Sequence, residues 1–151
     1  MCPHEQNEER QNTPAAAGAR LAIVIVSWNV RDLLARCLTS IFDELNHMPQ
    51  ESAAVWVVDN ASTDGSAEMV ASRFPAVRLI ANADNRGFAA ANNQALRAAG
   101  FEGQTPADEL PDFVILLNPD TTLQPDALRL WLDAALANPR AGVVGGALRY
   151  P

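Results

Sequence analysis

Short apolar runs rich in β-branched residues alternate along this chain with longer segments in which apolar residues recur every three or four positions. The first run, Leu21 to Ser27, is apolar at consecutive positions, as is typical of a strand buried on both faces. Similar runs follow at 54–59, 77–81, 113–117 and 141–148. Strands that alternate with helices predict βαβ units. We therefore expect an α/β fold with a mostly parallel sheet of five strands.

Four helices are expected to connect and cover these strands. The clearest spans Leu33 to Leu45, where apolar residues lie three and four positions apart. Asn29 and Asp32 are placed to cap its start, because their side chains accept hydrogen bonds from backbone N–H groups. The other helices are predicted at 67–74, at 88–99 with Gly100 as terminator, and after Pro125.

Length, charge and cysteine content limit what this protein can be. At 151 residues it can form one domain with a core that needs no disulfide or structural metal. Residues 1–19 are polar and aperiodic and are predicted to be a flexible tail before a domain at 20–151. A formal net charge of −7 without a basic stripe argues against nucleic acid as a partner.

The cellular address is expected to be the cytoplasm. Two cysteines, Cys2 and Cys37, suit a reducing compartment and exclude a disulfide framework. The polar first twenty residues lack the apolar region of a signal peptide, and no apolar run approaches the roughly 18 residues of a spanning helix.

Polar residues follow four of the expected strands at the point where each strand ends. These segments are 27–29, 59–64, 82–87 and 118–122. Ligands of open parallel sheets bind outside the carboxyl ends of the strands, so the four segments are expected to meet at one crevice. Taken one at a time, most of these residues are the ordinary residues of turns and helix caps. Neither explains the carboxylates of Asp59 and Asp120, which would repel each other in one cleft unless a divalent metal or a nucleotide were bound.

Several familiar sites are excluded by the same strand ends. Ser27-Trp28-Asn29 stands where a dinucleotide-binding fold has Gly-x-Gly-x-x-Gly, and no P-loop motif occurs. A response-regulator receiver is excluded because the first strand does not end in carboxylates. His4 and His47 are the only histidines, too few for a histidine-based triad or a histidine-rich zinc site.

Four motifs together resemble the GT-A glycosyltransferases of family two, in particular their rhamnosyltransferase-like branch. They are Ile-Val-Ile-Val-Ser-Trp-Asn (23–29), Val-Val-Asp-Asn-Ala-Ser-Thr-Asp-Gly-Ser (57–66), Asn-Arg-Gly-Phe-Ala-Ala-Ala-Asn-Asn (85–93) and Leu-Leu-Asn-Pro-Asp (116–120). Each motif is weak alone, but their order covers the chain from about residue 21 onward. The resemblance implies a GT-A, Rossmann-like sheet flanked by helices, here truncated after the fifth strand.

The resemblance also implies which residues bind a nucleotide sugar. Asp59, with Ser27 and Asn29, would contact the base and ribose, accepting hydrogen bonds from an imide N–H or a sugar hydroxyl. Asn60 and Asp64 would hold the loop after the second strand in shape. The implied nucleotide-sugar-binding set is Ser27, Asn29, Asp59, Asn60, Asn85, Gly87, Asn92 and Asn118.

A divalent cation is implied at the end of the fourth strand. Asn118-Pro119-Asp120 occupies the place of the family's Asp-x-Asp signature, with Asn in place of the first Asp. Asp120 would hold Mg²⁺ or Mn²⁺ against the donor diphosphate, which supplies further oxygen ligands. The catalytic base remains unassigned, because in the family it lies beyond the fifth strand, here beyond residue 151. Asp126 is interpreted instead as a favourable charge in the first turn of the last helix, and Asp133 as a residue on its solvent-exposed face.

The implied function is metal-assisted, inverting transfer of a sugar, with rhamnose favoured, from a nucleoside-diphosphate sugar to a glycan or lipid-linked acceptor. Such an enzyme would serve cell-surface polysaccharide or glycan synthesis, in the cytoplasm or at the inner membrane face through further segments or partners. One alternative is a non-catalytic nucleotide-binding fragment. Another is a nucleotidyltransferase, although the triphosphate loop of such enzymes is absent after the first strand. An uncovered fifth strand exposing Val143, Val144 and Leu148 predicts a dimer through that edge.

Overall fold

The computed structural model describes residues 18–48, 52–103 and 105–149 and confirms the α/β class. Its sheet has four parallel strands in the order β3-β2-β1-β4. The strands are β1 (Arg20–Ser27), β2 (Ser52–Asp59), β3 (Arg78–Ala81) and β4 (Phe113–Leu117). The helices are α1 (Arg31–Asn46), α2 (Ser66–Arg73), α3 (Phe88–Ala98) and α4 (Ala127–Ala137). The first four strands and all four helices therefore form where the sequence pattern predicts them. The expected tail lies almost wholly outside the described residues.

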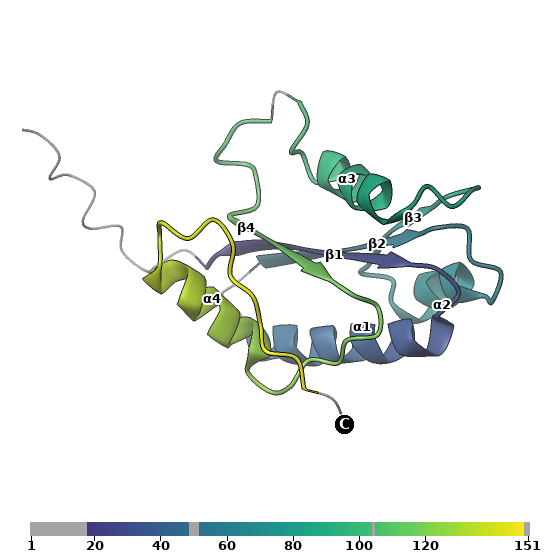
Figure 1. Ribbon diagram of the computed structural model, residues 1–151, viewed down its shortest axis with the longest axis horizontal. Helices are drawn as coiled ribbons and strands as arrows, with labels where there is room; N and C mark the ends of the chain where they lie inside the picture. Colours follow the sequence, from purple (N-terminus) through teal and green to yellow (C-terminus); the bar gives the residue numbers. More distant parts are fainter. Residues whose placement is uncertain (1–17, 49–51, 104, 150–151) are drawn as a thin grey trace, which may run out of the picture.

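Helices cover the two faces of the sheet unequally, with α1, α2 and α4 on one side and α3 on the other (Figure 1). Ile23 and Ile25 of β1 pack into the larger core on the α1 side, whereas Val24 packs with Ala91 and Ala95 of α3. Consecutive residues of β1 are therefore buried on opposite faces, which explains its unbroken apolar run. Fully burying each such side chain contributes roughly 1.5–3 kcal/mol, so this strand is the centre of the fold.

The helices leave part of β4 uncovered. Phe113 and Ile115 pack against the α1-side core, but Val114 and Leu116, which alternate with them, are 36% and 54% exposed. Within the described residues, β4 pairs with β1 alone, so its outer edge has no strand beside it. The sheet is therefore open on this side.

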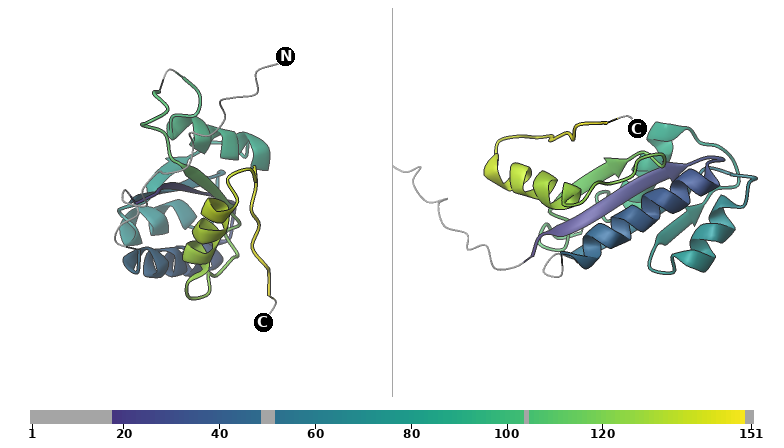
Figure 2. Two further views of the ribbon diagram at one scale, coloured as in Figure 1. Left: turned by 90° about the vertical axis from the view of Figure 1, so that its left-hand side faces the viewer. Right: turned by 90° about the horizontal axis from the view of Figure 1, so that it is seen from below.

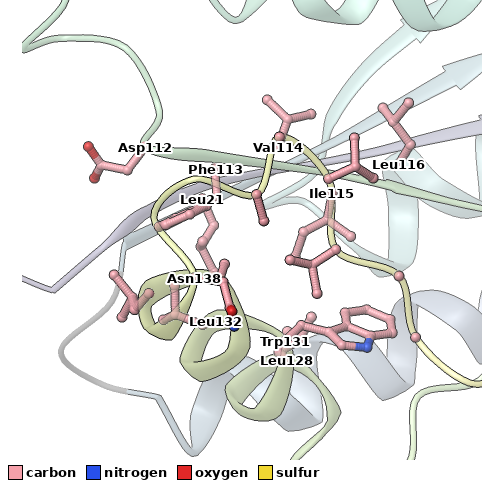
Figure 3. A pocket seen from close by; sticks show the side chains of 18 of the residues that line it. Leu21, Asp112, Phe113, Val114, Ile115, Leu116, Leu128, Trp131, Leu132 and Asn138 are labelled. Atoms are coloured by element: carbon pink, nitrogen blue, oxygen red, sulfur yellow. The ribbon is translucent and has the colours of Figure 1, made fainter.

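The predicted fifth strand is wrong. Residues 141–149 lie beside α4 without pairing to the sheet (Figure 2), and an apolar groove of about 930 Å³ separates them from β4 (Figure 3). Val143 and Leu148 are 90% and 77% exposed. Their exposure was predicted, but they lie on an unpaired segment and not on a strand. Glycines weaken a strand, and Gly146 lies where a Cβ would come within 2.5 Å of the Trp131 ring. The segment therefore meets α4 at Trp131 and pairs with none of the described strands.

The predicted cap of α1 is also wrong. Val30 occupies the N-cap position, and the Arg31 N–H donates to Oδ2 of Asp64 at 2.9 Å. Asn29 has φ +53° and its side-chain oxygen accepts from Thr63 instead. Similarly, α4 begins at Ala127 and not at Pro125, and Asp126 precedes the helix. Among the described residues, none of the helices is long and apolar enough to cross a membrane.

Candidate functional site

Two buried oxygen atoms without partners lie at the carboxyl ends of the two central strands. Ser27 ends β1 and Asp59 ends β2, and the strand register places them side by side. Both are buried, and Oγ of Ser27 and Oδ1 of Asp59 receive no hydrogen bond from any described residue. Oδ2 of Asp59 accepts from the Ser62 N–H at 2.9 Å. Leaving a buried polar atom unpaired costs about 1–3 kcal/mol, so this pair indicates where a ligand with donor groups would bind.

Asn29 connects the turn after β1 to the loop after β2. Its N–H donates to Oγ of Ser62 at 2.9 Å, and its Oδ1 accepts from the Thr63 N–H at 2.7 Å. The left-handed backbone that this requires is one that asparagine tolerates better than most residues. The side-chain oxygen of Asn29 is therefore occupied in holding the two loops together.

Asp64 supports the same loop. Its Oδ1 accepts from the N–H and Oγ of Ser66, while Oδ2 accepts from Arg31. Burial acts to raise the pKa of Asp64, but the hydrogen bonds from Ser66 and Arg31 outweigh it and leave this pKa below its ordinary value. The geometry thus gives Asp64 a structural role at the starts of α1 and α2.

A cluster of four side-chain amides joins the end of β2 to the loop before α3. Asn60 donates from Nδ2 to Oδ1 of Asn85 at 2.8 Å, and its own Oδ1 accepts from Asn82 and from the Arg86 N–H. The cluster comprises Asn60, Asn82, Asn85 and Gln94. Gln94 was not among the residues that the sequence pattern singles out, because its partner belongs to a different element and nothing local marks it.

The turn at Gly87 brings the backbone to the start of α3. Gly87 has φ +79°, a conformation that favours glycine, and no side chain caps the helix. The N–H groups of the first helical turn therefore remain available to a ligand. Asn92 differs from the other predicted residues in that its Nδ2 donates to the Phe88 carbonyl of its own helix, and its side chain is buried.

One stripe of α1 holds the loop that follows β4. Sγ of Cys37 donates to the Asn118 carbonyl, Oγ of Ser40 accepts from the Leu123 N–H, and Glu44 accepts from the N–H groups of Asp126 and Leu128. Burial raises the pKa of the Cys37 thiol to about 12, and the nearby charge of Asp120 adds to the effect. These contacts from α1 hold the loop in place, while Asp120 stays exposed to solvent.

The side chains of Asn118 and Asp120 offer oxygen donors suited to a hard cation. Both residues are exposed, and among the described residues no group of three or more His, Cys, Asp and Glu side chains could hold a metal ion. One carboxylate and one amide oxygen therefore fit Mg²⁺ or Mn²⁺ only if phosphate oxygens or water complete the coordination shell. A site of this kind would depend on its ligand.

Comparison with known families and curated proteins gives consistent matches. Residues 22–151 match the model of glycosyl transferase family 2. Two curated proteins, the N-acetylglucosaminyl-diphospho-decaprenol L-rhamnosyltransferases of two Mycobacterium tuberculosis strains, are each 33% identical over 132 residues. The match covers 87% of this chain and 42% of the relatives' length.

Solved structures show the same fold. The mannosyltransferase PcManGT from Pyrobaculum calidifontis, in complex with GDP-Man and Mn²⁺, aligns with a TM-score of 0.63 and 25% identity, covering 78% of this chain and 32% of that one. TarS from S. aureus aligns with a TM-score of 0.57 and 19% identity over 80% of this chain and 19% of its own. At that identity the likeness to TarS concerns the fold alone.

Proposed function

The chain belongs to glycosyl transferase family 2, and on that premise we propose that it binds a nucleoside-diphosphate sugar and acts in transfer of the sugar to an acceptor. The observation that carries this proposal is the pair of unpaired buried oxygens of Ser27 and Asp59. Both lie at the carboxyl ends of adjacent parallel strands, where open α/β sheets bind ligands.

The base, the ribose and the diphosphate of a nucleotide sugar each have matching groups at this edge of the sheet. Asp59 would accept a hydrogen bond from the base or the ribose, and Ser27 can donate or accept beside it. Asn85 and Gly87 stand at the start of α3, where backbone N–H groups favour the negative charge of a diphosphate. Asn29 and Asn60 support the site by holding its loops, as their hydrogen bonds indicate.

A divalent cation fits the proposal on the side of β4. Asp120 would hold the ion with help from Asn118, and the solved mannosyltransferase relative contains Mn²⁺. When bound, the ion would neutralise negative charge on the leaving nucleoside diphosphate. The contacts of Cys37, Ser40 and Glu44 would keep the loop in place for this role.

The relatives also suggest the substrates. The curated relatives are named as L-rhamnosyltransferases acting on a diphospho-decaprenol, and at 33% identity they favour rhamnose as the sugar and a lipid-linked glycan as the acceptor. Inversion at the anomeric carbon would need a general base to deprotonate the acceptor hydroxyl. We assign none, because Asp126 is the N-cap residue of α4, with its N–H held by Glu44, and Asp133 is an exposed residue within that helix.

Binding can be tested by thermal unfolding with UDP, dTDP, GDP or CDP, each with and without Mn²⁺. A nucleotide at about 100 times its Kd should add roughly 2.7 kcal/mol, which raises Tm by several degrees. Asp59→Asn should abolish the shift, whereas Asp133→Asn, an exposed change on α4, should leave it intact.

A transfer assay with the preferred nucleotide sugar separates catalysis from binding alone. Transfer to a lipid-linked acceptor would support the enzyme, whereas binding without transfer would favour a nucleotide-binding fragment. If none of the four nucleotides raises Tm of the unmodified chain with or without Mn²⁺, the proposal is wrong.

A further inference from the structure

The four amides beside Asp59 form a directional chain of hydrogen bonds. Nε2 of Gln94 donates to Oδ1 of Asn82 at 3.0 Å, and Nδ2 of Asn82 donates to Oδ1 of Asn60 at 3.2 Å. Nδ2 of Asn60 then donates to Oδ1 of Asn85 at 2.8 Å. Because an amide has donors on nitrogen and acceptors on oxygen, each link determines which way the next amide is turned.

Backbone N–H groups fix the direction of this chain at two points. The Arg86 N–H donates to Oδ1 of Asn60 at 3.0 Å, and the Gly87 N–H donates to Oδ1 of Asn85 at 2.9 Å. A backbone N–H can only donate, so both positions must hold oxygen and not nitrogen. The direction therefore follows from chemistry even though oxygen and nitrogen of an amide have similar shapes.

This direction determines how the amide of Asn85, the last member of the hydrogen-bond chain, is turned. Its oxygen is occupied by two donors, while no described residue accepts a hydrogen bond from its Nδ2. Asn85 is exposed, and it stands two residues before Gly87, the N-cap of α3. Its free NH₂ group therefore adds two donors beside the unpaired N–H groups at the helix start.

We propose that Gln94 and Asn82 are positioning residues that keep the amide of Asn85 turned so that its NH₂ group meets the diphosphate of the nucleotide. This inference rests on the proposed function. Gln94 never touches the nucleotide; its Nε2 holds the oxygen of Asn82, which leaves the nitrogen of Asn82 to hold Asn60. The reverse direction would turn the Asn85 oxygen toward the phosphates and leave Arg86 and Gly87 without acceptors.

Gln94→Glu tests the direction because a carboxylate cannot donate to Asn82. At pH 7.5 the variant should bind the nucleoside diphosphate roughly tenfold more weakly, the scale of one neutral hydrogen bond. Protonation gives the introduced carboxyl group an O–H donor, so affinity should return relative to the unmodified chain as the pH falls toward about 4 to 5. The unmodified chain, which shares the carboxylates of Asp59 and Asp84, is measured at each pH with the same nucleotide as the reference.

Two further variants separate direction from charge and from packing. Gln94→Leu removes the donor without adding a charge and should show no recovery at low pH. Ala98→Glu adds the same charge to an exposed position one helical turn along α3 and should bind normally at both pH values. An affinity of Gln94→Glu that equals that of the unmodified chain, or that does not recover at low pH, would overturn the proposal.

A measurement without nucleotide keeps the two proposals apart. At neutral pH, amide hydrogen exchange at Arg86 and Gly87 should be faster in Gln94→Glu than in the unmodified chain and should slow again at low pH after correction for intrinsic rates. If that holds but no nucleotide binds, the proposed function fails while the role of Gln94 in orienting the loop stands. Unchanged exchange would contradict the role of Gln94 itself.

Discussion

The two sides of the sheet differ in the side chains they present: one has hydrogen-bonded polar loops and the other has exposed apolar residues. On the side of β2 and α3, loops far apart in sequence are joined by side-chain hydrogen bonds, and the unpaired buried oxygens of Ser27 and Asp59 lie at the strand ends. On the outer side of β4, apolar residues such as Leu116 and Val143 are exposed around a groove. The first side therefore has preformed polar loops, which in the proposed function would receive the nucleotide. The second adds little to stability and presents apolar surface.

The largest expected effect concerns packing in the core compared with packing beside the groove. Leu38→Ala removes a fully buried side chain of α1 and should lower the free energy of unfolding by about 2–5 kcal/mol. Leu136→Ala, at a 58% exposed position beside the groove, should change it by no more than about 0.5 kcal/mol. Urea unfolding followed by circular dichroism measures both. Equal losses would show that the groove side is packed as well as the core.

Glu44 connects α1 to the start of α4, and its removal should have the next largest effect. Its carboxylate accepts from the N–H groups of Asp126 and Leu128 at the start of α4. Glu44→Ala leaves these donors without their acceptor and should cost about 1–3 kcal/mol in urea unfolding. Glu44→Gln keeps one acceptor oxygen and should cost less. If Glu44→Gln is as unstable as Glu44→Ala, the charge matters and the hydrogen bonds do not.

Acid should weaken the contact between β1 and the segment before β4. Hydrogen bonds from the Arg20 side chain and N–H lower the pKa of Asp112. A carboxyl whose pKa is lower in the folded chain stabilises the fold above its unfolded pKa of about 3.9 and loses this effect as pH falls through the folded value. Asp112→Asn should therefore flatten the loss of stability below about pH 4.

Asp43→Asn, an exposed change on α1, serves as the control for this pH profile. Thermal unfolding from pH 7 to 2.5 supplies the measurement. Identical acid profiles for Asp112→Asn and the unmodified chain would contradict the role of Asp112.

The smallest effect expected is weak association of two copies through the open edge of β4. Leu116 is 54% exposed there, and strand edges with apolar side chains tend to pair. Leu116→Lys should reduce association in sedimentation velocity at high protein concentration, whereas Leu130→Lys, at a 62% exposed position on α4, should not. A chain that stays monomeric at all concentrations would show that the edge does not associate.

Local patterns in the sequence were sufficient for most of the fold. The unbroken apolar run of β1 predicts a strand buried on both faces, and the register then places Ser27 beside Asp59. The run at 141–148 is also apolar, but it contains three glycines, which disfavour a strand, and it has no partner strand among the described residues. The apolar run alone therefore overpredicted a strand there.

Contacts between distant residues account for the other differences. Asp64 caps α1 from 33 positions away, and Glu44 holds the start of α4 from 82 and 84 positions away. Nothing in the neighbouring sequence marks either role. Gln94 was missed for the same reason, since its hydrogen-bond partner Asn82 lies outside α3, in the loop after β3.

Mapping of backbone amide signals by ¹H–¹⁵N NMR would test most directly whether the polar strand ends form the ligand site. The unmodified chain would be titrated with the preferred nucleoside diphosphate in the presence of Mg²⁺. We expect the largest shifts at residues 27–29, 59–63, 85–89 and 118–121, with those at 113–116 and 141–146 unchanged. Shifts confined to the groove beside β4 would contradict a nucleotide site at the carboxyl ends of the strands.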